Sequence, residues 1–197
     1  LVEAGANINT VALPETDITL KADELTSADR GIGTSALVFA IINAHYDTAA
    51  LLIEKGAGLD IGDAAGMTPL YAVVDMEHQE PMVNRPLPKP SGRLVALDVV
   101  KILLDRGANP NATLKTPLLM RQHNGGDGSL GEGATPLMRA SKVSDAALIR
   151  LLLDKGADPN LRLRNQTTAL MIAASRAARN AGPEQKTIDA MTVLLAK

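Results

Sequence analysis

Apolar residues recur along the chain at helical spacing, and each such stretch ends in the same short phrase. Leu148, Leu151 and Leu152 predict an amphipathic helix over 145–154, and residues 98–105 repeat the pattern. The phrase is two leucine-like residues, two polar residues and Gly-Ala, complete at 52–57, 103–108 and 152–157 and shortened at 1–6 and 194–197. A helix-ending phrase that returns at intervals indicates stacked copies of one small unit.

A second phrase marks where helices begin. Thr-Pro-Leu occurs at 68–70 and 135–137, and weaker forms occur at 35–37 and 168–170. A Thr or Ser side chain can accept a hydrogen bond from the first helical turn, and Pro at the next position loses no helical hydrogen bond. Gly after the closing leucines permits the left-handed turn that ends a helix. We prefer Thr135 to Thr116 as the start of the third full unit, because Thr116 lies too far from Gly156.

The spacing of these two phrases defines a unit of 33 residues. Ser35 to Gly56 spans 21 positions, and Gly56 to Thr68 spans 12. Two helices with a short turn fit the longer interval, and an extended connection, which we call a finger, fits the shorter one. Other intervals are longer, which predicts insertions.

The predicted single array comprises residues 1–9 (end of a preceding repeat), 35–67, 68–111 with an inter-helix insertion at 77–94, 135–167 preceded by a finger insertion at 112–134, and 168–197 with an inter-helix insertion.

These phrases resemble the ankyrin repeat, a 33-residue unit that begins with Thr-Pro-Leu and ends with Leu-Leu-x-x-Gly-Ala and an Asp-x-Asn turn. Residues 7–9, 109–111 and 158–160 stand where the family has that turn. The resemblance implies an all-α solenoid of stacked helix-turn-helix units with finger loops or short hairpins. The chain departs from the family at the His that often follows Thr-Pro-Leu. That place holds Val38, Tyr71, Met138 or Met171.

Composition narrows the class of protein. Apolar residues make up 46% of the 197 residues and aromatic residues only 2%, so the core must be aliphatic. The formal net charge of −2 gives no electrostatic reason to expect nucleic acid. No apolar run approaches the ~18 residues that span a bilayer, so we expect a soluble segment with no membrane partner. The chain starts inside a repeat and reads as a fragment, and its compartment is not predicted.

Candidate catalytic and metal-binding patterns are weak. His45, His78 and His123 share no metal-ligand spacing, and the chain has no Cys. Residues 126–131 match the Gly-x-Gly-x-x-Gly phosphate fingerprint, but no buried strand precedes them, so a Gly-rich finger tip is the better interpretation. We therefore predict that the chain is not an enzyme and has no cofactor, no metal site and no catalytic residue.

The resemblance implies a non-catalytic scaffold that binds another protein on a concave surface of fingers and first helices. The partner is unidentified. We expect a monomer, although its uncapped ends could associate. The predicted partner-binding residues are Ile42, Asn43, Ala65, Met67, Asp75, Met76, Lys142, Val143, Arg164, Asn165, Ser175 and Arg176.

Two other functions fit the sequence. The chain could be a regulatory or recognition domain of a larger multidomain enzyme. It could also bind a small molecule at the Gly-rich finger, through Arg121, His123 and the glycines.

Overall fold

A computed structural model describes residues 5–12, 33–78, 88–116, 130–177 and 184–197 of the chain. These ranges contain eight α-helices and, in place of extended strands, only isolated β-bridges. The helices are α1 (Ala36–Ile42), α2 (Tyr46–Glu54), α3 (Pro69–Glu77), α4 (Ala96–Asp105), α5 (Pro136–Val143), α6 (Ala146–Asp154), α7 (Ala169–Ala177) and α8 (Glu184–Leu195). The predicted all-α class is confirmed.

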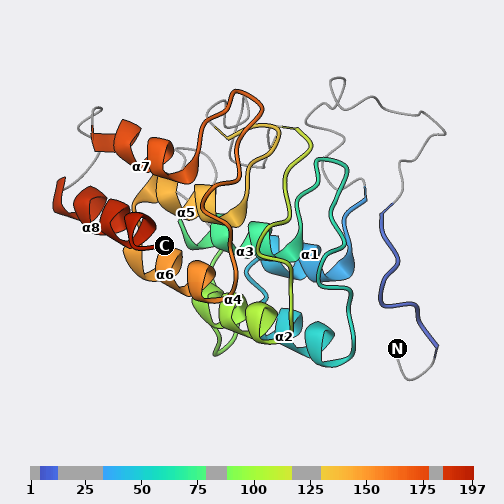
Figure 1. Ribbon diagram of the computed structural model, residues 1–197. Coiled ribbons are helices and arrows are strands. Elements are labelled where there is room, and N and C mark those ends of the chain that lie inside the picture. Colours follow the sequence, from blue (N-terminus) through green and yellow to red (C-terminus); the bar gives the residue numbers. More distant parts are fainter. Residues whose placement is uncertain (1–4, 13–32, 79–87, 117–129, 178–183) are drawn as a thin grey trace.

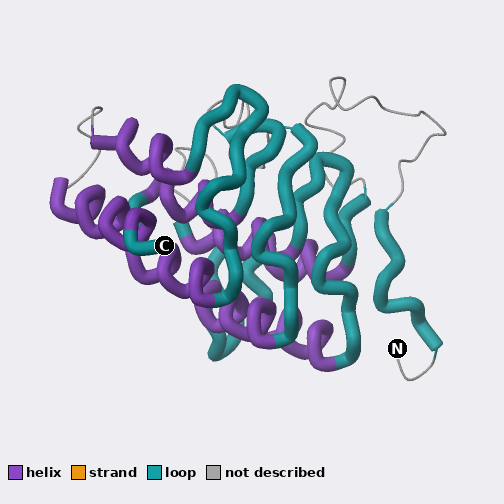
Figure 2. The backbone as a smooth tube through the Cα atoms, viewed as in Figure 1, coloured by secondary structure: helices purple, strands orange, loops and turns teal. Residues whose placement is uncertain are grey.

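The helices are stacked as four successive pairs in two rows (Figure 1). The first helices of the pairs, α1, α3, α5 and α7, pack one against the next, and each also packs against the second helix of its own pair. In the second row, α2 contacts α4 and α6 contacts α8. The connections between pairs run side by side along the stack (Figure 2). This is the arrangement of a helical repeat solenoid.

Local sequence determines where the first helices begin. The side-chain oxygens of Ser35, Thr68, Thr135 and Thr168 each accept a hydrogen bond from the backbone N–H three residues later, at 3.3–3.4 Å. Each satisfies a donor that the helix itself cannot. Helix α5 begins directly after Thr135.

Glycine determines where the second helices end. Gly56, Gly107 and Gly156 follow α2, α4 and α6 with φ values of +89°, +89° and +91°. An L-residue with a side chain rarely adopts this conformation, so the repeated Gly-Ala phrase is a backbone requirement. The prediction from the sequence is confirmed at all three positions.

The core lies between the two rows and between successive pairs, and aliphatic side chains dominate it. Large exposed apolar side chains concentrate on the first and last pairs. They are Phe39 and Leu51 on the first pair and Met171, Ile188 and Leu195 on the last, with Val95 the one described exception. Among the described residues, each outer pair packs against another helix pair on one side only.

Candidate functional site

Each finger is closed at its base by the same backbone hydrogen bond. The carbonyl of the residue before the helix cap accepts an N–H from the ascending arm in four places: Ala12 to Thr34 (3.0 Å), Asp63 to Met67 (3.2 Å), Leu114 to Ala134 (2.9 Å) and Leu163 to Thr167 (2.9 Å). The paired residues are four positions apart in the two short fingers and 22 and 20 apart in the two long ones. The long and the short fingers therefore share the same closing hydrogen bond at the base.

Hydrogen bonds from a side chain to the backbone shape the short finger that begins at Asp63. One carboxylate oxygen of Asp63 accepts hydrogen bonds from the N–H groups of Ala65 and Met67, both at 2.9 Å. Burial raises the pKa of Asp63, although these N–H groups and the charge of Lys115 oppose the shift. In the last finger, Asn165 plays a similar part by accepting from the Thr167 N–H at 3.1 Å.

Neighbouring fingers are joined to one another. The Lys115 N–H donates to the Ala65 carbonyl at 2.8 Å, and the Arg164 N–H donates to the Glu132 carbonyl at 3.1 Å. The Arg164 guanidinium also lies 3.1 Å from the Glu132 carboxylate. These contacts align the last three fingers with one another.

A second set of hydrogen bonds connects the turns that follow the second helices. Asn9 accepts from the Gly58 N–H at 2.7 Å, Asp60 from the Asn109 N–H at 2.8 Å, and Asn111 from the Asp158 N–H at 2.8 Å. Each bond joins one repeat to the next at the same place. The Asp-x-Asn phrases thus fix the spacing between repeats, as well as the turns within them.

The predicted partner-binding residues divide by exposure. Arg164, Asn165 and Ser175 are exposed, and the Arg164 side chain is 83% accessible. A further six are partly buried: Ile42, Asn43, Ala65, Met76, Lys142 and Val143. Arg176 lies in α7, and its side chain is outside the described part of the structure. Two predictions are wrong because Met67 and Asp75 are 4% and 1% exposed, which removes them from any surface that a partner could touch.

Asp75 is buried because it pairs with a residue of the next repeat. One Asp75 carboxylate oxygen lies 2.6 Å from Nε of Arg139, which is itself 6% exposed. Arg139 also donates to the carbonyl of His78 at 3.4 Å. This ion pair connects α3 to α5 inside the core, where two charges are tolerated only in combination. No sequence pattern predicts this pair, because the two residues are 64 positions apart.

The described histidines make structural contacts. Nδ1 of His45, at the start of α2, lies 2.9 Å from the Ser91 hydroxyl. Nε2 of His78, at the end of α3, lies 3.1 Å from the Asp145 carboxylate, without the alignment of a hydrogen bond. This contact with His78 holds the pKa of Asp145 below its usual value. Asp145 also caps α6 by accepting from the Leu148 N–H at 2.9 Å.

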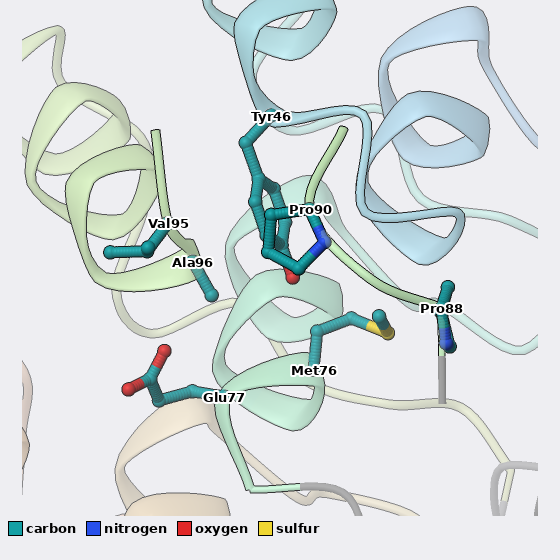
Figure 3. Close-up of a pocket in the computed structure, with 7 residues that line it drawn as sticks. All are labelled: Tyr46, Met76, Glu77, Pro88, Pro90, Val95 and Ala96. Carbon is teal, nitrogen blue, oxygen red and sulfur yellow. The ribbon is translucent and has the colours of Figure 1, made fainter. Parts of the chain in front are cut away.

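A pocket of about 170 Å³ lies where α3 ends and α4 begins (Figure 3). Tyr46, Met76, Glu77, Pro88, Pro90, Val95 and Ala96 line it. Burial, with the nearby charge of Glu77, raises the pKa of Tyr46 to about 12. Burial also raises the pKa of Glu77, and the neighbouring carboxylates of Asp145 and Asp98 add to this effect. Met76 is one of the residues that line this pocket, at the end of α3 that is farther from the finger.

Several sequence-based candidates lie outside the described residues. These include Arg121, His123 and residues 126–129 of the Gly-rich phrase. Within the described ranges, no group of three or more His, Cys, Asp or Glu side chains could hold a metal ion. In the same ranges, no helix is both long enough and apolar enough to cross a membrane.

Comparison with protein families identifies the repeats. A family model described as ankyrin repeats (3 copies) matches residues 96–182, and a model described as ankyrin repeat matches residues 65–115. The two matches together span residues 65–182, more than half of the chain. No curated protein matches the chain significantly. Ankyrin repeats are protein–protein interaction modules, and are typically non-catalytic. The chain belongs to the ankyrin repeat family.

Proposed function

We propose that the chain is a non-catalytic scaffold that binds a protein partner along the concave surface formed by its fingers and first helices. In this proposal residues 1–197 act as one array with the repeat boundaries predicted from the sequence. The supporting observation is the direct hydrogen bonding between neighbouring fingers, which makes separate repeats present one pre-formed surface. Pre-formed surfaces bind without the entropic cost of ordering loops.

The chemistry of the last two described fingers favours a partner segment that carries carboxylates. Arg162 and Arg164 are exposed on the same finger, and Lys115 is exposed on the finger before it. Glu132 offsets part of this positive charge through its ion pair with Arg164. Guanidinium groups bind carboxylates with two parallel hydrogen bonds, so they give both affinity and orientation.

Affinity capture with paired variants tests this proposal. The finger variant combines Arg164→Ala with Ser175→Ala, and the control combines Arg150→Ala with Thr48→Ala on exposed positions of α6 and α2. Both variants remove one guanidinium and one hydroxyl group. We expect the finger variant to recover specific partners at least about fivefold less than the wild type, since interface arginines often contribute more than ~1 kcal/mol. Equal recovery by the two variants would contradict the proposed surface.

A further inference from the structure

The pocket beside Tyr46 lies away from the fingers. Helix α3 begins at a finger, at Thr68, and ends at the pocket, with Glu77. Helices α3 and α4 are separated by a long stretch of sequence, residues 78–95. The outer wall of the pocket is formed by residues 88–95, which lead into α4 and which we call the returning segment.

The returning segment is fixed in place by the preceding repeat. The Ser91 hydroxyl lies 2.9 Å from Nδ1 of His45, and the Arg93 N–H donates to the Asp47 carboxylate at 2.6 Å. Gly92 passes so close that a Cβ there would overlap the Asp47 carboxylate. These contacts hold the pocket wall against the turn between α1 and α2.

The lining combines apolar walls with one ionisable carboxylate. Met76, Val95, Ala96 and the two prolines supply the walls, and Tyr46 contributes an aromatic ring that is 4% exposed (Figure 3). The Glu77 carboxylate points toward Ala96 and accepts a hydrogen bond from the Leu97 N–H at the start of α4. Val95, at the cap position of α4, has no side-chain acceptor, so Glu77 partly replaces the missing cap.

Size and charge restrict what can bind there. A volume of about 170 Å³ is below the ~300 Å³ typical of small-molecule sites, but it can accommodate one long side chain. Asp98 and Asp145 add negative charge near Glu77, and His78, which lies 3.1 Å from Asp145, has the opposite effect and offsets part of it. Lys89, between the two lining prolines, is exposed to solvent.

We propose that this pocket binds an arginine side chain of a protein partner, at a docking point separate from the finger surface. The methylene stem would lie along Met76 and Val95, and the guanidinium would bond to Glu77 beside the Tyr46 ring. Arginine fits better than lysine because its planar, weakly hydrated head both stacks on aromatic rings and pairs with carboxylates.

Tyrosine NMR can test this site, because the chain has only two tyrosines. Tyr46 lines the pocket, and Tyr71, 1% exposed in the core, is an internal reference. The intact chain with ring-labelled tyrosine is titrated with N-acetyl-arginine methylamide, the matching lysine derivative and the neutral citrulline derivative. We expect saturable shifts of Tyr46 alone with arginine, with a dissociation constant on the order of 1 mM, weaker binding of lysine and none of citrulline.

Two variants give the decisive comparison. Glu77→Gln removes the charge but keeps an oxygen that can accept from Leu97, and Glu54→Gln removes an exposed carboxylate of α2 as a control. We expect Glu77→Gln to weaken arginine binding by about tenfold or more, as is usual for a lost charged hydrogen bond, and Glu54→Gln to leave it unchanged. Circular dichroism and thermal melting establish that both variants are folded.

The proposal would be overturned by no saturable shift of Tyr46, by equal shifts with citrulline, or by unchanged binding by Glu77→Gln. None of these depends on the finger surface, so this proposal and the proposed function can fail separately. Stronger binding of the lysine derivative would also overturn the assignment to arginine.

Discussion

Among single residues that the structure describes, Tyr46 has a hydroxyl group whose pKa is strongly shifted. Its pKa is raised to about 12, first by burial and then by the charge of Glu77. In the unfolded chain the hydroxyl would titrate near its ordinary value of about 10. The folded protein therefore holds this proton more tightly. Tyr46 contributes stability that is fully present below about pH 10 and is lost as the pH rises toward 12.

We predict that the phenolate absorbance of the native wild type minus that of Tyr46→Phe has its midpoint at a pH of about 12. In denaturant the same difference should titrate near 10, which is the ordinary tyrosine value, give or take roughly half a unit. Glu77→Gln should lower the native midpoint only in part, because burial is the larger cause. A native midpoint near 10 would show that Tyr46 is solvated and that the pocket wall does not cover it.

The features of this fold that the sequence predicted best are those that depend on residues close together in the chain. The helix caps at Thr68 and Thr135 and the glycines after α2, α4 and α6 act within three or four positions, so a short phrase contains all of the interaction. The burial of Asp75 and Met67 could not be predicted in this way. It depends on which side chain of the next repeat lies opposite, and that is set by stacking register.

At the scale of elements, the Asp75–Arg139 pair is the clearest link between adjacent first helices. Its atoms are 2.6 Å apart and both side chains are less than 10% exposed. Removing one charge from such a pair leaves the other in a medium that solvates it poorly. Replacing both by apolar residues avoids that cost.

We predict that Arg139→Met lowers the free energy of unfolding by about 3–5 kcal/mol. The double variant with Asp75→Leu should recover most of this loss, since neither charge then remains in the core. Urea denaturation followed by circular dichroism measures both. A single variant as stable as the wild type would mean that α3 and α5 are not in this register.

Close packing between fingers depends on glycine at one position. Gly66 and Gly133 have φ values of +82° and +90°, and an added Cβ on Gly133 would lie 2.8 Å from the Arg162 carbonyl oxygen of the next finger. The equivalent position in the last finger is Gln166, with φ of +67°. No further finger follows Gln166 among the described residues, so its side chain meets no neighbour of this kind.

We predict that Gly133→Ala lowers the free energy of unfolding by about 1–3 kcal/mol, because it combines an unfavourable φ with a backbone clash. Gln166→Gly should change it by less than about 1 kcal/mol, since relief of strain offsets the added freedom of the unfolded chain. Thermal melting of both variants is the measurement. Equal destabilisation by the two would indicate that the fingers are not in contact.

At the scale of the whole molecule, the sequence predicted the solenoid but not its second surface. The distances between the repeated phrases located the long fingers in the sequence. The structure shows that the same backbone hydrogen bond closes the base of the two long fingers and of the two short ones. The pocket between α3 and α4 was not predictable, because the returning segment at 88–95 packs on the preceding repeat through contacts 46 positions apart, such as His45 with Ser91. Contacts of this kind leave no periodic pattern in the amino-acid sequence.

We propose that the aligned fingers and first helices form the surface that contacts a protein partner. Hydrogen exchange, measured for the chain alone and with its captured partner, tests this proposal. We expect slower exchange at finger residues 62–67, 130–134 and 162–167, and little change in α2, α4 and α6. Protection confined to those second helices, with unchanged exchange in the fingers, would contradict it.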